Sequence, residues 1–262
     1  MTTPDRRWRV AGSGRRPGVT VTMVLFGLVA IAAAAGCIRL GFWQLDRLQE
    51  RRTKNALVRS RSEATPVSVS AVRGQDTSVI HWRRVSVRGV ADYGAEMVHA
   101  TRSQNGSPGV YLLTPVRPLD GTWGDTAVLV LRGYVAAADG RTVDWNATRE
   151  SDTLQFDALV TSFPVPRPGA VRMPSEPRAV RTLDRDSLSA AMARPLAPFV
   201  LLMLGDTVVR DVSRPARIPP PSPSEGPHKS YAFQWFGFSA VALVGFGAFI
   251  VTDRRKGQPD DV

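Results

Sequence analysis

The residues best suited to chemistry lie together at the start of the C-terminal apolar segment. His228 carries an imidazole, Tyr231 a phenol and Trp235 an indole, and Pro227 directly precedes them. Proline is favoured in the first turn of a helix, so the segment predicts a helix that opens at His228. At about 100° per residue, the three side chains share one face of that helix. His228 is then either an axial ligand for haem iron or a histidine packed at a membrane interface.

The rest of the chain offers few reactive constellations. It has three histidines and one cysteine, Cys37, which excludes an internal disulfide framework, a thiolate zinc site and a CxxCH haem attachment. The sequence contains no Walker loop, no GxGxxG or GxSxG motif and no HExxH pair. The carboxylates are scattered and form no recognisable acid/base couple. We therefore expect a protein without enzymatic activity and without catalytic residues.

The net charge of +11 comes from 34 Lys and Arg against 23 Asp and Glu. Only Lys54, Lys229 and Lys256 are lysines. This arginine bias is more typical of a genome's composition than of a designed basic patch, and no nucleic-acid-binding motif accompanies it. We expect no nucleic-acid partner.

Two long uncharged runs, residues 19–38 and 231–251, dominate the hydropathy pattern. Each is about 20 residues long, enough for a helix to cross the hydrocarbon core of a bilayer. Trp235 and Tyr231 lie at one end of the second run, where aromatic side chains favour the membrane interface. The pattern predicts two transmembrane helices, with the lipid bilayer as a partner.

The first run has two other interpretations. Its small residues suit a cleaved secretory signal, and residues 34–37, Ala-Ala-Gly-Cys, resemble a weak lipoprotein cleavage box that would leave Cys37 at the new terminus. However, apolar character continues through Leu40, Phe42 and Trp43 into a helix-like stretch. An uncleaved anchor is therefore our interpretation.

Between the two runs, the spacing of the apolar residues changes along the chain. Residues 40–60 predict a helix that leaves the membrane, and beyond them short alternating segments separated by turns such as Asn105-Gly106 predict strands. The strands are expected at residues 66–70, 84–88, 96–101, 110–116, 127–135, 153–161, 179–183 and 199–209, with one short helix at 186–193. Many strands with few helices favour an antiparallel barrel or sandwich.

The expected fold class is a membrane-anchored α+β protein, in which two transmembrane helices bracket an extracytoplasmic, antiparallel β-rich domain. Arginines before the first run favour a cytoplasmic N-terminus, although basic residues at the other end of that run nearly balance them. The predicted organisation is a cytoplasmic N-terminus (1–18), a first span (19–38), the extracytoplasmic domain (39–213), a Pro-rich connector (214–227), a second span (228–252) and a cytoplasmic tail (253–262).

Four motifs in order carry a family resemblance. LGFWQLDRL at residues 40–48 follows the first span, RVSVRG at 84–89 and RGYV at 132–135 lie among the strands, and PSPSEGPHKSYAFQWF at 221–236 opens the second span. Together they resemble the Surfeit locus protein family of cytochrome c oxidase assembly factors, over about residues 20–255. Lys229 and Tyr134 depart from the family pattern, which usually has an apolar residue and a Trp there.

The resemblance implies a protein of the bacterial or mitochondrial inner membrane, with the central domain outside the cytoplasm or matrix. We expect the bacterial inner membrane, with a multi-pass chain and both termini in the cytoplasm. The resemblance implies a role in assembling the haem a–copper oxidase, by receiving haem a from haem a synthase and aiding its insertion into the catalytic subunit. An alternative is a membrane scaffold that holds a nascent oxidase subunit without binding haem.

The resemblance also assigns site residues. His228 matches the family histidine proposed to contact haem, and it is the candidate ligand of the haem iron. The remaining cofactor-binding candidates match the two motifs beside the spans: Trp43, Gln44, Arg47, Tyr231, Gln234 and Trp235.

Overall fold

The computed structural model describes residues 21–165, 172–173, 176–205, 215–220 and 222–256. The chain divides into two compact units. The helical unit comprises residues up to 54 and from 224 onward, and the β unit comprises residues 55–223. The predicted N-terminal segment 1–18 lies outside the described residues.

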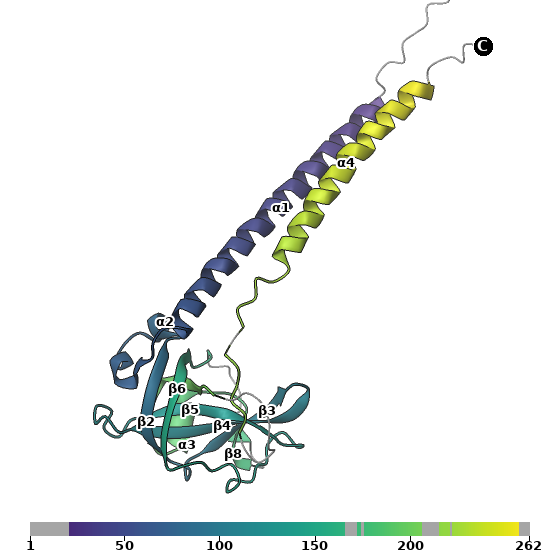
Figure 1. Ribbon diagram of the computed structural model, residues 1–262. Coiled ribbons are helices and arrows are strands. Elements are labelled where there is room, and N and C mark those ends of the chain that lie inside the picture. Colours follow the sequence, from purple (N-terminus) through teal and green to yellow (C-terminus); the bar gives the residue numbers. More distant parts are fainter. Residues whose placement is uncertain (1–20, 166–171, 174–175, 206–214, 221, 257–262) are drawn as a thin grey trace, which may run out of the picture. The chain divides into compact units, whose positions relative to one another are not determined.

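Two long helices, α1 (Val21–Ser62) and α4 (His228–Lys256), lie side by side in the helical unit (Figure 1). They run antiparallel, because Phe26 contacts Phe246 near one end of the pair and Phe42 contacts Phe236 nearer the other. Small residues bring the helices together: a Cβ atom at Gly41 would lie only 2.5 Å from the Phe236 ring. The buried residues of α1 recur at the 3–4 spacing of a helix-packing seam: Gly27, Ala30, Ala34, Gly41, Gln44 and Leu48.

Both helices are long and apolar enough to cross a membrane, by length and composition. Large apolar side chains point away from the helix seam, such as Phe233 at 68% exposed and Val244 at 71% exposed. Such a surface is unfavourable in water and suits lipid. In α1, the predicted first span and the predicted helix at 40–60 form one continuous helix of 42 residues.

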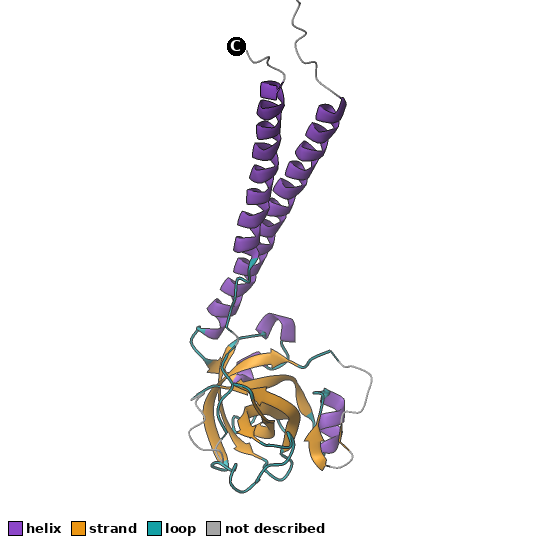
Figure 2. Cartoon of the chain, turned by 90° about the vertical axis from the view of Figure 1, so that its right-hand side faces the viewer, coloured by secondary structure: helices purple, strands orange, loops and turns teal. Residues whose placement is uncertain are grey.

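The β unit is built on a closed five-stranded barrel (Figure 2). Around the barrel the order is β2 (Arg84–Ala91), β6 (Thr153–Ser162), β9 (Leu196–Met203), β5 (Ala127–Ala136) and β4 (Ser107–Pro118). Closure comes from β2 and β4, which pair antiparallel from Gly89 opposite Pro118 to Ala91 opposite Val116. The barrel leaves no free edge along these five strands, which removes a route to aggregation.

Shorter elements extend the sheet beyond the barrel. β3 (Met97–Gln104) pairs with β4, β8 (Glu176–Val180) with β3, β7 (Arg172–Met173) with β8, and β1 (Val67–Ser68) with β2. The remaining helices are η1 (Val69–Val72), α2 (Thr77–Ile80) and α3 (Arg185–Ala191). Three strand pairs, β1–β2, β3–β8 and β5–β9, are parallel, so the sheet is mixed.

The barrel interior is filled by the alternate residues of its strands. Val85 and Val87 of β2, Ala158 of β6, and Phe199 and Leu201 of β9 are at most 1% exposed. This is the period-2 burial that the valine alternation predicts. The predicted class, two terminal apolar helices bracketing a barrel-like β domain, is confirmed.

Two details differ from the sequence prediction. The alternation at 66–70 predicts a strand, but only Val67 and Ser68 are extended, and a 3-10 helix follows. The hydroxyl of Ser68 accepts a hydrogen bond from the backbone N–H of Ser70, which stabilises the turn. Val69 and Val72 are both buried in that turn. They lie three residues apart, which is one turn of a 3-10 helix, so they point to the same side. The strand expected at 199–209 is β9, which begins earlier, at Leu196, and ends at Met203. Residues 206–209 lie outside the described part of the chain.

Candidate functional site

The helical unit brings His228 against a residue of the other helix. The Nδ1 atom of His228 lies 2.8 Å from Oε1 of Gln44, and Gln44 is only 9% exposed. An amide oxygen can only accept a hydrogen bond, so Nδ1 is the donor in this contact, and in the neutral imidazole the lone pair then belongs to Nε2. Nε2 has no hydrogen-bond partner among the described residues. The geometry therefore orients the ring through Nδ1 and leaves Nε2 as the nitrogen that a metal ion could bind.

The turn before α4 leaves space beside that nitrogen. Gly226 has a φ of +69°, a left-handed conformation that residues with a side chain rarely adopt. A Cβ atom at this position would lie 3.6 Å from Nε2 of His228. Glu225 fixes the turn from the other side, because its carboxylate accepts two hydrogen bonds from Arg52 of α1, at 2.8 and 3.1 Å. The Arg52–Glu225 pair was not predicted, since nothing local in the sequence links the two residues.

The other sequence candidates on α1 form a second pair. The guanidinium carbon of Arg47 lies 5.6 Å from the ring centroid of Trp43, within range of a cation–π interaction. Arg47 also forms a 2.8 Å ion pair with Glu50. Trp43 is 47% exposed, so its ring remains open to a partner or to lipid.

The other candidates on α4 follow His228 within the first two turns of the helix. Trp235 is half-buried and lies 5.9 Å, ring to ring, from Phe238. Tyr231 is 46% exposed, and Gln234 is exposed. The structure thus brings His228 and Gln44 together, and Trp43 and Arg47 together. Among the described residues, neither Tyr231 nor Gln234 has a side-chain hydrogen bond or ring contact with His228.

In the β unit, Arg132 of the sequence motif RGYV is fully buried. Its side chain is 0% exposed and forms ion pairs with Glu96 at 2.6 Å and Glu150 at 2.7 Å. Nε of Arg132 also donates to the Thr114 hydroxyl at 2.8 Å, and Nη1 donates to the Thr148 carbonyl at 3.0 Å. Each partner satisfies a donor that would otherwise be buried without a hydrogen bond.

The same network holds the segment that leads toward α4. Arg217 donates to Glu150 at 2.6 Å and to the Arg132 carbonyl at 2.8 Å, and Ala216 pairs with Tyr134 through two backbone hydrogen bonds. The pKa of Glu150 is lowered: burial alone would raise it, but hydrogen bonds and charges from Arg217 and Arg132 outweigh that effect. The RGYV motif therefore has a structural role in this unit.

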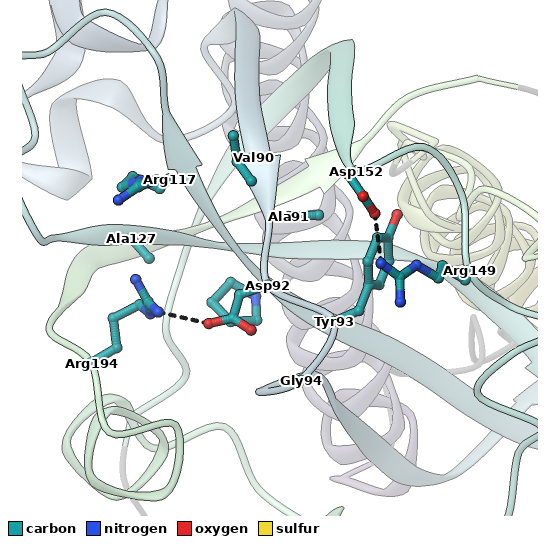
Figure 3. A pocket seen from close by; sticks show the side chains of 11 residues that line it. Val90, Ala91, Asp92, Tyr93, Gly94, Arg117, Ala127, Arg149, Asp152 and Arg194 are labelled. Atoms are coloured by element: carbon teal, nitrogen blue, oxygen red, sulfur yellow. Dashed lines mark hydrogen bonds and ion pairs between the residues drawn. The ribbon is translucent and has the colours of Figure 1, made fainter.

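A polar hollow of about 360 Å³ lies at the end of β2 (Figure 3). Two of its arginines are neutralised, Arg194 by Asp92 at 2.7 Å and Arg149 by Asp152 at 2.8 Å. Arg117, which also lines it, is exposed and has no hydrogen-bond or ion-pair partner among the described residues. Because most of the charge is already paired, the hollow offers an incoming anion little net attraction.

The other two histidines each have a ring nitrogen hydrogen-bonded within the β unit. Burial lowers the pKa of His99 to about 4, and its Nε2 lies 3.1 Å from the Arg181 carbonyl. Burial, followed by the charge of Arg61, also lowers the pKa of His81, whose Nδ1 accepts a hydrogen bond from the backbone of Ser162. Within the described residues, no group of three or more His, Cys, Asp or Glu side chains could hold a metal ion.

The architecture defines a class: a five-stranded barrel protein with two terminal helices able to cross a membrane. The model of the SURF1 family matches residues 31–240, and the chain belongs to that family. This confirms the resemblance carried by the sequence motifs.

Three relatives agree with this assignment, and each is a SURF1-like protein of a Rickettsia species. The protein of Rickettsia felis is 23% identical over 220 residues, covering 83% of this chain and 92% of its own length. The Rickettsia conorii protein is 23% identical over 229 residues, covering 86% and 89%. The Rickettsia bellii protein is 23% identical over 210 residues, covering 79% and 83%.

Proposed function

We propose that this protein assists the assembly of haem a–copper cytochrome c oxidase by binding haem a transiently through His228. Membership of the SURF1 family implies the assembly role. The observation that carries the haem step is the 2.8 Å contact between His228 and Gln44, which leaves Nε2 without a partner. A histidine oriented by a hydrogen bond through its other nitrogen is the usual form of a metal-ligating imidazole.

The surroundings of His228 support haem as cargo. A haem has a large apolar face and two carboxylates, so it requires apolar surface and cations near its ligand. Trp235 and Trp43 offer aromatic surface, while Arg47 and Lys229 offer positive charge. Tyr231 and Gln234 complete the proposed contacts, and both are accessible. The iron contributes the coordination bond, and the chain contributes the fixed tautomer and the open position beside Gly226.

The proposed partners follow from this role. Haem a synthase would supply the haem, and the catalytic subunit of the oxidase would receive it. Transfer requires that binding be reversible, and a single histidine ligand provides a weaker hold than two ligands. We propose no chemical conversion of the haem, so the protein acts as an assembly factor rather than an enzyme.

We place the protein in the bacterial inner membrane, with residues 39–213 outside the cytoplasm and both termini inside. Support comes from the arginines at residues 6, 7, 9, 15 and 16 and from the cluster of Arg254, Arg255 and Lys256, since basic residues are retained in the cytoplasm. Fusions of green fluorescent protein and alkaline phosphatase to the C-terminus test this. Fluorescence without phosphatase activity is expected, and the reverse result would place the terminus outside.

The haem step is tested by absorbance titration of the detergent-purified chain with haem a. The wild type is compared with His228→Ala and with His81→Ala as a control. We expect saturable binding near one equivalent in the wild type and in His81→Ala, and its loss in His228→Ala. Binding that is unchanged in His228→Ala would move the ligand to His81 or His99.

The second candidate function is a scaffold that holds a nascent oxidase subunit without touching haem. The observation in its favour is an exposed strip on α1, where Leu40, Phe42 and Trp43 are 39–57% exposed between Arg39 and Asp46. Absence of haem binding in every variant would favour this function. It predicts that His228→Ala leaves oxidase assembly intact while Trp43→Ala reduces it.

A further inference from the structure

A second hollow of the β unit has a lining unlike that of Figure 3. It lies where η1, the β4–β5 loop and the start of β9 meet, and its volume is about 650 Å³. This is within the usual range for small-molecule sites. The lining includes an apolar segment, Pro195 to Pro198, together with Arg73, Arg185 and Trp123.

Neither arginine of this hollow has an ion pair among the described residues. Arg73 lies over the Trp123 ring, with its guanidinium carbon 5.9 Å from the ring centroid. Nε of Arg185 donates to the Leu196 carbonyl at 3.0 Å, and its terminal nitrogens have no hydrogen-bond partner among the described residues. Two positioned guanidinium groups with free donors favour an oxyanion.

No carboxylate belongs to the described lining of the hollow. Asp120 accepts hydrogen bonds from Ser70 and Thr122, which do line it, so those two hydroxyls are already used. The hydroxyl of Thr126 has no such partner. Even with Asp120 counted, the arginines leave an excess positive charge.

The indole of Trp123 gives an independent sign of a missing acceptor. Trp123 is 4% exposed, and its Nε1 is a buried donor without a hydrogen-bond partner among the described residues. Its ring packs edge-on against Phe199, with the centroids 6.0 Å apart, so the side chain is held in place. A buried N–H without a partner is unfavourable, so an acceptor on a bound ligand that reached Nε1 would be favoured.

We propose that this hollow binds a phosphate or carboxylate group attached to a small apolar body. Arg73, Arg185, Trp123 and Thr126 supply donors to the oxyanion, and the Pro195–Pro198 segment contacts the apolar part. The site belongs to the β unit and uses none of the residues assigned to haem, so it does not depend on the function proposed above.

The test is isothermal titration of the full detergent-purified chain with hexyl phosphate, octanoate, inorganic phosphate and hexanol. The variant Arg73→Gln/Arg185→Gln removes both guanidinium groups. The control, Arg59→Gln/Arg88→Gln, removes the same charge from exposed positions outside the hollow. Trp123→Phe keeps an aromatic ring against Phe199 but removes the N–H donor.

We expect saturable binding of hexyl phosphate and octanoate by the wild type and the control, and none of hexanol. Binding should weaken about ten-fold or more in Arg73→Gln/Arg185→Gln and several-fold in Trp123→Phe. Inorganic phosphate that binds as tightly as hexyl phosphate would identify a free oxyanion as the ligand, and weaker binding would identify a lipid-like anion. Absence of binding in the wild type, or equal loss in the control, would overturn the proposal.

Discussion

Gln44 and His228 are separated by 184 positions in the sequence, yet their side chains meet at 2.8 Å between Oε1 and Nδ1. Gln44 belongs to the buried seam of α1, and His228 is the first residue of α4. The packing of the two helices therefore places an acceptor at Nδ1 and orients the imidazole ring. Replacement of Gln44 tests this relationship directly.

Gln44→Leu keeps the size of the side chain but removes the acceptor for Nδ1–H. We expect the ¹⁵N resonances of the His228 ring to shift toward a mixture of the two neutral tautomers. The affinity for haem a should fall about ten-fold, the lower end of the effect of losing an orienting partner. Gln49→Leu, at an exposed position of α1, is the matched control and should leave both measurements unchanged. Unaltered haem affinity in Gln44→Leu would show that the contact has no role in binding.

Gly226→Ala tests the open position beside Nε2. The new Cβ would lie 3.6 Å from Nε2 of His228. The alanine would also have to adopt a φ of +69°, which is unfavourable for a residue with a side chain. We expect haem a binding to weaken several-fold, while circular dichroism shows that the helices remain. The control is Gly237→Ala on α4, where no atom lies within 4 Å of the added Cβ. Equal affinities in the two variants would exclude a steric role for Gly226.

The sequence predicts the two helices that carry this site, but it does not predict the contact between them. Pro227 and the apolar run beyond it indicate a helix from His228, and the motif around Trp43 indicates a helix after the first span; both helices are present. The contact with Gln44 could not be predicted, because periodicity shows which residues share a face but not which faces pack together.

In the β unit, too, the local elements are predictable from the sequence and the long-range pairings are not. Alternating valines predict β2 locally, and the Asn105-Gly106 dipeptide predicts the turn between β3 and β4, where both residues have positive φ. The parallel pairing of β5 with β9 depends on a crossover that no local pattern encodes. The burial of Arg132 could not be predicted from the sequence either, because its partners Glu96 and Glu150 lie on other segments.

Arg132→Met tests that buried network. The substitution leaves Glu96, which is 1% exposed, without its ion-pair partner, and a buried uncompensated charge is strongly destabilising. We expect the free energy of unfolding to fall by about 3–5 kcal/mol, measured by urea denaturation with tryptophan fluorescence. Arg84→Met is the matched control on β2.

Arg84 pairs with Asp157 at the same 2.7 Å separation, but the two side chains are 35% and 33% exposed. Solvent screening limits such a pair to about 1 kcal/mol or less. Similar losses in the two variants would mean that burial adds nothing to the Arg132 network. A double variant, Arg132→Met/Glu96→Leu, should recover part of the stability, since it removes both buried charges.

His99 makes the stability of the β unit dependent on pH. Burial lowers its pKa to about 4 from an ordinary value of 6.5, so the folded chain holds the neutral imidazole. The unfolded chain binds a proton at a higher pH than the folded chain does. Stability from this residue is therefore complete above pH 6.5 and is lost as the pH falls toward about 4.

We expect the free energy of unfolding to decrease by up to about 3 kcal/mol over that interval because of His99 alone. His99→Asn retains an N–H that can donate to the Arg181 carbonyl but cannot titrate. Its unfolding free energy should change less between pH 6.5 and pH 4 than that of the wild type, when both are measured by urea denaturation. Parallel pH profiles for the two proteins would show that His99 titrates normally in the folded state, which its burial between β4 and β8 makes unfavourable.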